Sequence, residues 1–225
     1  TFDKCFFMPS DLTAGLEYNR DRLKDNMWGY NRHTDQTVNI YSAFLQNEWK
    51  NDRWGILIGG RLDKHNMVDN VIFSPRANLR FNPTQNINLR LSYSSGFRAP
   101  QAFDEDMHIE NVGGTVAMIE RAKDLKEEKS QSFSVSADMY HRFGAFQTNL
   151  LIEGFYTRLT DVFVLGKPYD RGDGILVKTR SNGPGAKVMG LTLEGKVAYL
   201  SILQIQAGLT LQRSRYDEPH KWHDD

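Results

Sequence analysis

The chain has 225 residues, and its 28 Lys or Arg balance its 28 Asp or Glu, so the formal net charge is zero. This balance argues against a nucleic-acid-binding protein, which normally carries a basic excess, and the 40% hydrophobic content argues against a disordered chain. The single cysteine, Cys5, excludes an internal disulfide and gives no basis for a metal cluster or a thiol redox pair. There is no apolar run of about 18 residues to predict a transmembrane helix. Membrane-spanning β-strands are not excluded, because such strands alternate apolar and polar residues and contain no long apolar run.

Apolar and polar residues alternate with a period of two through most of the chain. This period predicts β-strands with one apolar and one polar face, because successive side chains of a strand point to opposite sides. Clear alternation covers Leu12–Asn19, Val71–Phe81, Ile87–Tyr93, Gln131–Met139, Met189–Tyr199 and Leu203–Gln212. Trp54–Leu62 fits more loosely, and Val38–Trp49 and Thr148–Thr157 are mixed.

The connections between these segments alternate between short and long. The short ones are Lys50–Arg53, Asn82–Gln85, His141–Ala145 and the turn around Ser201. The long ones are Arg20–Gln36, Asp63–Asn70, Ser95–Ser130 and Leu159–Lys187. This order predicts an antiparallel meander with its short turns at one end and its long loops at the other, which is the layout of an outer-membrane barrel.

Strand length and residue placement also favour a barrel. Several predicted strands run about 9 to 13 residues, longer than the usual 5 to 6 of globular sheets. Aromatic residues stand near the ends of the apolar stripes, as interfacial girdles require: Tyr18, Trp54, Phe73, Phe81, Tyr93 and Tyr199. A cation facing lipid at mid-depth costs about 2–4 kcal/mol. The polar stripe, which holds Arg76, Arg80, Arg90 and Lys196, should therefore line the inside.

A soluble antiparallel sandwich is the competing architecture. Its strands also carry one apolar and one polar face, because one side packs in a core and the other meets water. Alternation alone does not separate the two, whereas the asymmetry of turn lengths favours the barrel.

Several stretches, taken in order and spacing, carry a family resemblance: Tyr41–Trp49, Gly59–Asp63, Phe73–Phe81, Gly96–Pro100 and Asp124–Ser130. From about Asn39 onward the chain resembles the middle and late barrel of TonB-dependent outer-membrane receptors. Phe97-Arg98-Ala99-Pro100 looks like the family's Phe-Arg-Ala-Pro box. Asp124–Ser130 is similar to its Asn-Pro-Asp-Leu-Lys-Pro-Glu box, but departs from it with Ala122-Lys123 in place of Asn-Pro and Glu127 in place of Pro.

The resemblance implies a transmembrane β-barrel of roughly 22 strands with a plugged lumen. The chain offers about ten of them, so we expect residues 1–225 to be part of one all-β barrel domain, without the plug domain or the final strands. The implied protein is not an enzyme. It is a receptor of the bacterial outer membrane that imports a scarce nutrient such as an iron chelate, haem or cobalamin. A passive porin-like or structural outer-membrane barrel and a soluble β-sheet ligand-binding domain stay open as alternatives.

The resemblance also implies the partners. They are TonB, reached through an upstream plug, the nutrient at extracellular loops, and outer-membrane lipid. We expect no cofactor and no nucleic acid. The scattered Ser, His and Asp residues form no recognisable catalytic arrangement.

Three residues are candidates for ligand contact. Phe97 and Arg98 close a strand on the long-loop side, which suits a ligand-facing mouth, although strand termination before Pro100 explains them as well. His108 lies in the region where haem receptors of this family use a histidine, and an ordinary loop histidine is the alternative.

Other polar residues give weaker signals. His33 and His65 lie in predicted long loops, whereas His141 lies at a short turn, where a ligand role is not expected. The acidic run Asp104–Asp106 could donate oxygens to Ca²⁺, but its spacing does not complete the six to eight ligands required. We therefore expect a solvated acidic loop there and no metal site.

Overall fold

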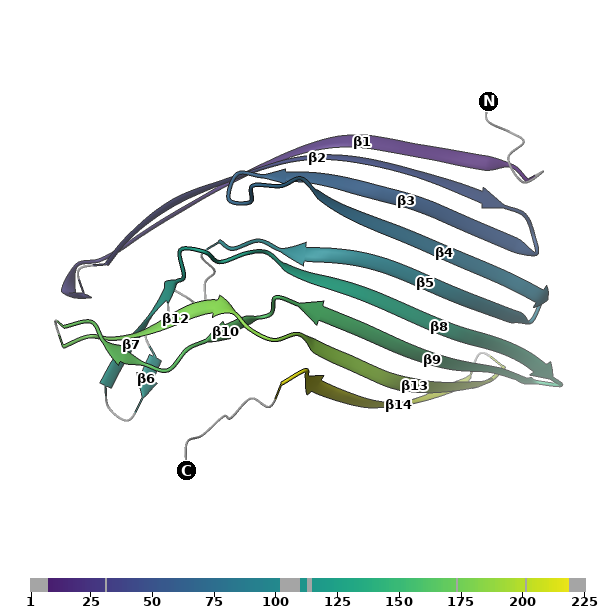
Figure 1. Cartoon of the computed structure of the whole chain (residues 1–225). Coiled ribbons are helices and arrows are strands. Elements are labelled where there is room, and N and C mark those ends of the chain that lie inside the picture. Colours follow the sequence, from purple (N-terminus) through teal and green to yellow (C-terminus); the bar gives the residue numbers. More distant parts are fainter. Residues whose placement is uncertain are drawn as a thin grey trace.

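The protein is an antiparallel sheet of nine long strands with a smaller sheet at one end (Figure 1). The structure is a computed structural model and describes residues 8–30, 32–101, 110–112, 115–172, 174–200 and 202–218. The large sheet has the order β1-β2-β3-β4-β5-β8-β9-β13-β14. Its strands are β1 (Ser10–Met27), β2 (Arg32–Lys50), β3 (Trp54–His65), β4 (Ile72–Thr84), β5 (Ile87–Arg98), β8 (Glu128–Phe143), β9 (Phe146–Thr160), β13 (Ala186–Tyr199) and β14 (Leu203–Tyr216).

These nine strands confirm the predicted all-β meander. Each contains between 12 and 19 residues, and each pairs antiparallel with its neighbour in the sheet. Within the described residues β1 and β14 are unpaired edges, so the sheet is open, as expected of a barrel segment. Among the described residues there is no helix of the length and apolar character needed to cross a membrane.

The large sheet is a single layer, which contradicts the sandwich alternative. A sandwich would bury the middle of its strands against a second sheet. The largest fully buried side chains of the described residues are instead Met118, His65 and Val177. Met118 and Val177 lie in the smaller sheet, and His65 is the last residue of β3. The apolar stripes of the long strands stay exposed.

One face of the large sheet, the apolar face, carries aromatic residues at both ends of its stripes. Register partners share a face, and Tyr18 stacks on Tyr41 with ring centroids 4.9 Å apart at the loop end. At the turn end Trp54 stacks on Phe81 at 4.2 Å. The loop-end belt consists of Tyr18, Tyr41, Phe73, Tyr93, Phe133 and Tyr156; the turn-end belt consists of Trp54, Phe81, Phe143, Phe146 and Tyr199.

The opposite, polar face is built as predicted. It carries Arg76, Arg80, Arg90 and Lys196, the cations expected on the inside. Polar side chains bond across it, as in the Thr192–Thr210 hydroxyl pair at 3.1 Å. The out-of-phase Phe155 also lies here. It faces its register partner Gly190, where an added Cβ would stand 2.5 Å from the ring.

All four predicted long loops are wrong in part. β3 continues through the first three residues of Asp63–Asn70 and ends at His65. β1 and β2 continue through most of Arg20–Gln36, joined by the short helix η2 (Trp28–Tyr30). The apolar pattern did not predict this part of the hairpin because its strands carry charged residues. Arg22 forms an ion pair with Asp35 across the two strands at 2.9 Å. Ser95–Ser130 and Leu159–Lys187 hold the strands of the smaller sheet. Parts of this second sheet pair residues about 60 positions apart, beyond the reach of a local pattern.

Candidate functional site

The smaller sheet is built by the two longest connections and stands at the loop end of the large sheet (Figure 1). Its strands are β6 (Glu110–Val112), β7 (Thr115–Arg121), β10 (Phe163–Leu165), β11 (Tyr169–Asp170) and β12 (Leu176–Asn182). The order is β10-β12-β7-β6, with β11 also paired to β12. β7 and β12 run parallel, from Ala117 opposite Leu176 to Arg121 opposite Arg180. The two connections therefore form one unit.

An apolar centre supports this pairing. Val177 is fully buried and Met118 is 1% exposed, and these two residues are register partners. Ile119 and Val162 are buried as well. Burying an aliphatic side chain stabilises by about 1.5–3 kcal/mol, so this small core is strong enough to hold the two connections together.

Asn182 fastens the smaller sheet to the large one. Its Oδ1 accepts the Lys126 N–H at 2.7 Å, and its Nδ2 donates to the carbonyls of Lys126 at 3.0 Å and Asp161 at 2.8 Å. It thereby ties the entry to β8 and the exit of β9 to the end of β12. Glu128 adds a second tie, accepting the Phe163 N–H at 2.9 Å.

Phe97 and Arg98 lie where β5 enters this unit. Phe97 is half-buried and packs on a cluster of Val68, Ile72 and Ala99. The Arg98 guanidinium lies 5.6 Å from the centre of the Phe163 ring. The structure thus places both residues at the base of the loop-end unit, whereas His108 and Asp104–Asp106 lie outside the described residues.

His65, weighed above as a loop residue, ends β3 and is fully buried. Its Nδ1 accepts the Met67 N–H at 3.0 Å, so the proton is assigned to Nε2, which lies 3.3 Å from Gln101 Oε1. His65 therefore supports the turn after β3. His33 lies in β2, and its ring packs edge-to-face with the exposed Trp28, with the ring centroids 4.8 Å apart.

A charge cluster on the polar face joins the first three strands; we call it the wall cluster and define it as Glu17, Ser42, Arg61 and Asp63. Arg61 donates to Glu17 at 2.9 Å, to Asp63 at 2.8 Å and to Ser42 Oγ at 2.7 Å. Ser42 donates in turn to Asp63 at 2.5 Å. Asp63 is 2% exposed, so the cluster satisfies a carboxylate that burial alone would penalise. Sequence reasoning missed this cluster, since it needs the register of three strands.

A cavity of about 350 Å³ opens where β4 and β5 separate. Their ladder ends at Arg76 opposite Ser94, next to Pro75, which has no N–H to donate. Lys129 and Tyr93 are among its lining residues. Among the residues that the structure describes, no group of three His, Cys, Asp or Glu side chains could hold a metal ion.

Several solved structures share this architecture. The siderophore receptor PirA from Pseudomonas aeruginosa superposes with a TM-score of 0.79 at 18% identity, over 94% of this chain and 40% of that one. A variant of the ferric enterobactin receptor PfeA from Pseudomonas aeruginosa gives 0.70 at 19% identity, over 92% and 33%. The FrpB iron transporter from Neisseria meningitidis gives 0.63 at 15% identity, over 92% and 33%. This chain thus spans well under half the length of each.

These superpositions establish the fold, and a match to a family model identifies the family. No curated protein matches the sequence. The family model described as "TonB dependent receptor-like, beta-barrel" matches residues 2–224. Barrels of this family are outer-membrane proteins and transporters rather than enzymes, and the match covers nearly every residue. The chain belongs to the TonB-dependent receptor family, as part of its β-barrel.

Proposed function

We propose that this chain forms part of an outer-membrane receptor that imports a scarce nutrient. Iron chelates are the first candidate class, and haem and cobalamin are the others. The observation that carries the proposal is the family match over residues 2–224. The names of PirA, PfeA and FrpB, which refer to a siderophore, ferric enterobactin and iron, support the choice of iron chelates as the first candidate cargo.

In this proposal the smaller sheet forms part of the extracellular mouth. Long connections between barrel strands are uncommon unless they are functional, and here β7 and β12 hold two of them in one rigid unit. Residues 1–225 belong to a single barrel domain, and a plug encoded upstream fills the lumen and contacts TonB. The wall cluster, on the polar face, then lies on the lumen wall.

The test is uptake of cargo labelled with radioactive iron, or with radioactive cobalt for cobalamin, by cells that carry or lack the complete receptor. Ferric catecholate and hydroxamate chelates, haem and cobalamin are supplied separately under nutrient limitation. We expect uptake of one of these cargoes to fall to background when either the receptor or TonB is removed. Uptake of all of them that is independent of both would refute the proposal.

Ligand contact by Phe97, Arg98 and His108 stays a prediction. His108→Ala and Arg98→Ala are expected to weaken cargo binding about tenfold, since each substitution removes one hydrogen bond or polar contact to the cargo. His141→Ala, at a turn-end position, is the matched control. Binding that is unchanged in the first two variants removes those residues from the mouth.

A further inference from the structure

The strand β12 ends in a chemically reactive pair, Asn182 followed by Gly183. An asparagine before a glycine is prone to spontaneous deamidation, in which the backbone nitrogen of the next residue attacks the side-chain amide. Glycine favours this attack, because it has no Cβ to shield its nitrogen and it leaves the backbone free to bend. Asn-Gly occurs once in the 225 residues.

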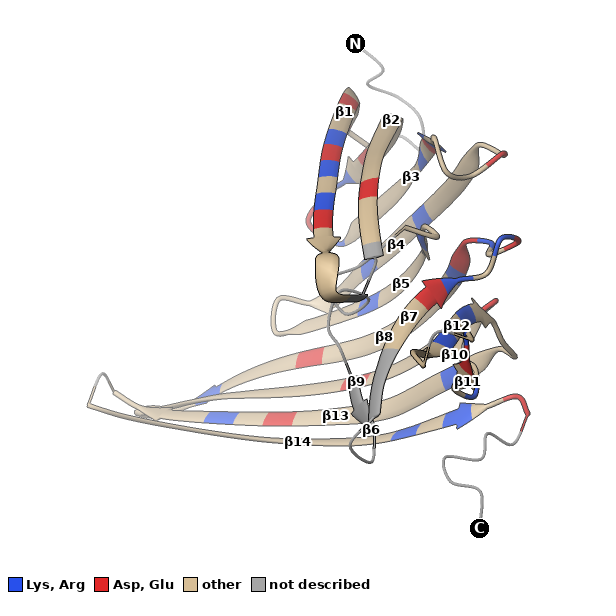
Figure 2. Ribbon diagram, turned by 90° about the vertical axis from the view of Figure 1, so that its left-hand side faces the viewer, with Lys and Arg blue, Asp and Glu red and all other residues tan. Residues whose placement is uncertain are grey.

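Packing requires a glycine at position 183. β10 and β12 lie side by side at the loop end (Figure 2), and a Cβ on Gly183 would stand 2.7 and 2.8 Å from the two methyl carbons of Val164 on β10. The Gly183 N–H also donates to the Val162 carbonyl at 2.7 Å. A larger residue would therefore push these two strands apart.

Hydrogen bonding requires an amide at position 182. The Asn182 side chain accepts the Lys126 N–H and donates to the carbonyls of Lys126 and Asp161. Asp161 has a φ of 54°, in the left-handed region that is unfavourable for residues other than glycine, so this bond helps to hold a strained turn. An amide offers both an acceptor and donors, whereas a carboxylate only accepts.

The same contacts block the reaction. Deamidation requires the Gly183 nitrogen to lose its proton and to reach Cγ of Asn182. In the structure that N–H is bonded to Val162, and the Asn182 amide is held by Lys126 and Asp161. Local opening of the smaller sheet would free both groups at once, because proteins open in cooperative units.

We infer that Asn182 is a protected deamidation site, which reacts when the smaller sheet opens and then prevents it from closing again. The Gly183 nitrogen bonds to Asn182 Cγ, the bond from Cγ to Nδ2 breaks, and ammonia leaves with the proton from that nitrogen. Water then opens the cyclic imide to aspartate or isoaspartate, and no oxidant or reductant is needed. The new carboxylate has no N–H for the two carbonyls, so the tie between the two sheets is lost.

The first test measures protection in the complete receptor, kept in neutral detergent and mildly alkaline buffer. Mass spectrometry follows deamidation of Asn182, and hydrogen exchange of the β7 and β12 amides reports opening. Val177→Ala removes buried methyl groups from the smaller sheet, and M118A/V177A replaces it if exchange is unchanged. Val197→Ala, at an exposed position of β13, is the matched control.

Deamidation should be at least about tenfold slower in the folded wild type than in urea, and about tenfold faster in the opened variant than in the wild type, since the rate follows the open fraction. The control should match the wild type. Equal rates in the folded and unfolded wild type would overturn the inference. So would a variant whose amides exchange faster while Asn182 reacts no faster.

The second test measures the consequence of the reaction. Asn182→Asp, which carries the product side chain, should raise hydrogen exchange of the β7 and β12 amides about tenfold, because two donors are lost. Asn78→Asp, on the polar face of β4, adds the same charge elsewhere and is the control. Heat-modifiable migration on gels checks that both variants fold. Exchange in Asn182→Asp that equals the wild type would refute release of the sheet, and neither test depends on the proposed cargo.

Discussion

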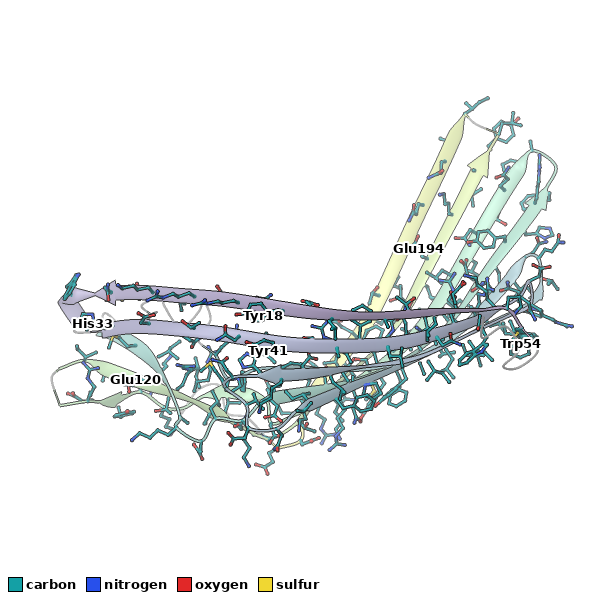
Figure 3. The ribbon with its side chains drawn as sticks, turned by 90° about the horizontal axis from the view of Figure 1, so that it is seen from above. Tyr18, His33, Tyr41, Trp54, Glu120 and Glu194 are labelled. Atoms are coloured by element: carbon teal, nitrogen blue, oxygen red, sulfur yellow. The ribbon has the colours of Figure 1, made fainter. Side chains whose placement is uncertain are left out.

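A single guanidinium organises the polar face near the loop end. Arg61 directs its donors to Glu17 on β1, Ser42 on β2 and Asp63 on its own strand β3. The planar, fork-shaped donor set of arginine makes this possible, whereas lysine offers only a point charge on a flexible stem. In Figure 3 Tyr18 marks β1 and Tyr41 marks β2, and these two strands run side by side.

Arg61→Gln should therefore destabilise the barrel by about 1–3 kcal/mol, because it leaves the buried Asp63 carboxylate with fewer donors. Thermal unfolding in detergent measures the change. Arg90→Gln is the matched control, because Arg90 lies on the same face and donates a hydrogen bond to Asn88 within its own strand. Equal losses in the two variants would show that the wall cluster has no special role.

At the scale of elements, the sequence predicted the strands better than their ends or their loops. Period-two alternation marks a strand only while apolar residues alternate, and it stops at Asn19 in β1, although charged pairs carry the ladder on to Met27. The smaller sheet was missed for another reason: β7 and β12 pair in parallel over a long sequence separation. Asn182 precedes a glycine, as a turn residue often does, and nothing in the sequence predicted the three hydrogen bonds of its side chain to the backbone of Lys126 and Asp161.

Close packing of glycine against an aromatic ring gives a prediction for β1 and β2. A Cβ on Gly15 would overlap the ring of Phe44, its register partner. Gly15→Val should cost about 1–3 kcal/mol through overpacking, and Phe44→Ala in the same chain should restore part of the loss. Gly195→Ala is the control, with no atom within 4 Å of the added Cβ. Urea unfolding compares them, and no rescue by Phe44→Ala would contradict this geometry.

The projecting part of the β1–β2 hairpin should be sensitive to acid. Arg22 donates to both carboxylate oxygens of Asp35, at 3.3 and 2.9 Å, and this hydrogen bonding lowers the pKa of Asp35. The resulting stabilisation is present above the ordinary carboxyl pKa of about 4 and is lost as the pH falls through the lowered value.

Hydroxyl-radical footprinting of Leu23, half-buried in this hairpin, measures the effect. Oxidation of Leu23 should rise between about pH 6 and about pH 3 in the wild-type protein. In Asp35→Asn it should be high at both values. Asp52→Asn, in the turn before β3, is the control and should behave as the wild type. A wild-type profile without pH dependence would exclude the ion pair as a support of the hairpin.

At the scale of the whole molecule, the two aromatic belts and the apolar stripes between them define an apolar band. The cations that the described strands carry on the same face lie on one side of this band, at the loop end, and so distinguish the two ends of the sheet. The sequence predicted the band, because it follows from alternation within each strand. It could not show the row of cations formed by Arg158, Lys187 and Arg215, since these residues become neighbours only through the register of three strands. Net charge hides the asymmetry as well, because the chain totals zero.

The orientation of the two faces gives the last prediction, on adjacent residues of β13. Leu193 lies on the apolar face, paired with Leu209, and Thr192 on the polar face, bonded to Thr210. If lipid covers the apolar face, Leu193→Arg near mid-band costs about 2–4 kcal/mol, whereas Thr192→Arg enters the hydrated lumen at little cost. The folded, heat-modifiable fraction recovered from outer membranes should fall sharply for Leu193→Arg alone. If Thr192→Arg were the damaging change instead, the two faces would have to be exchanged.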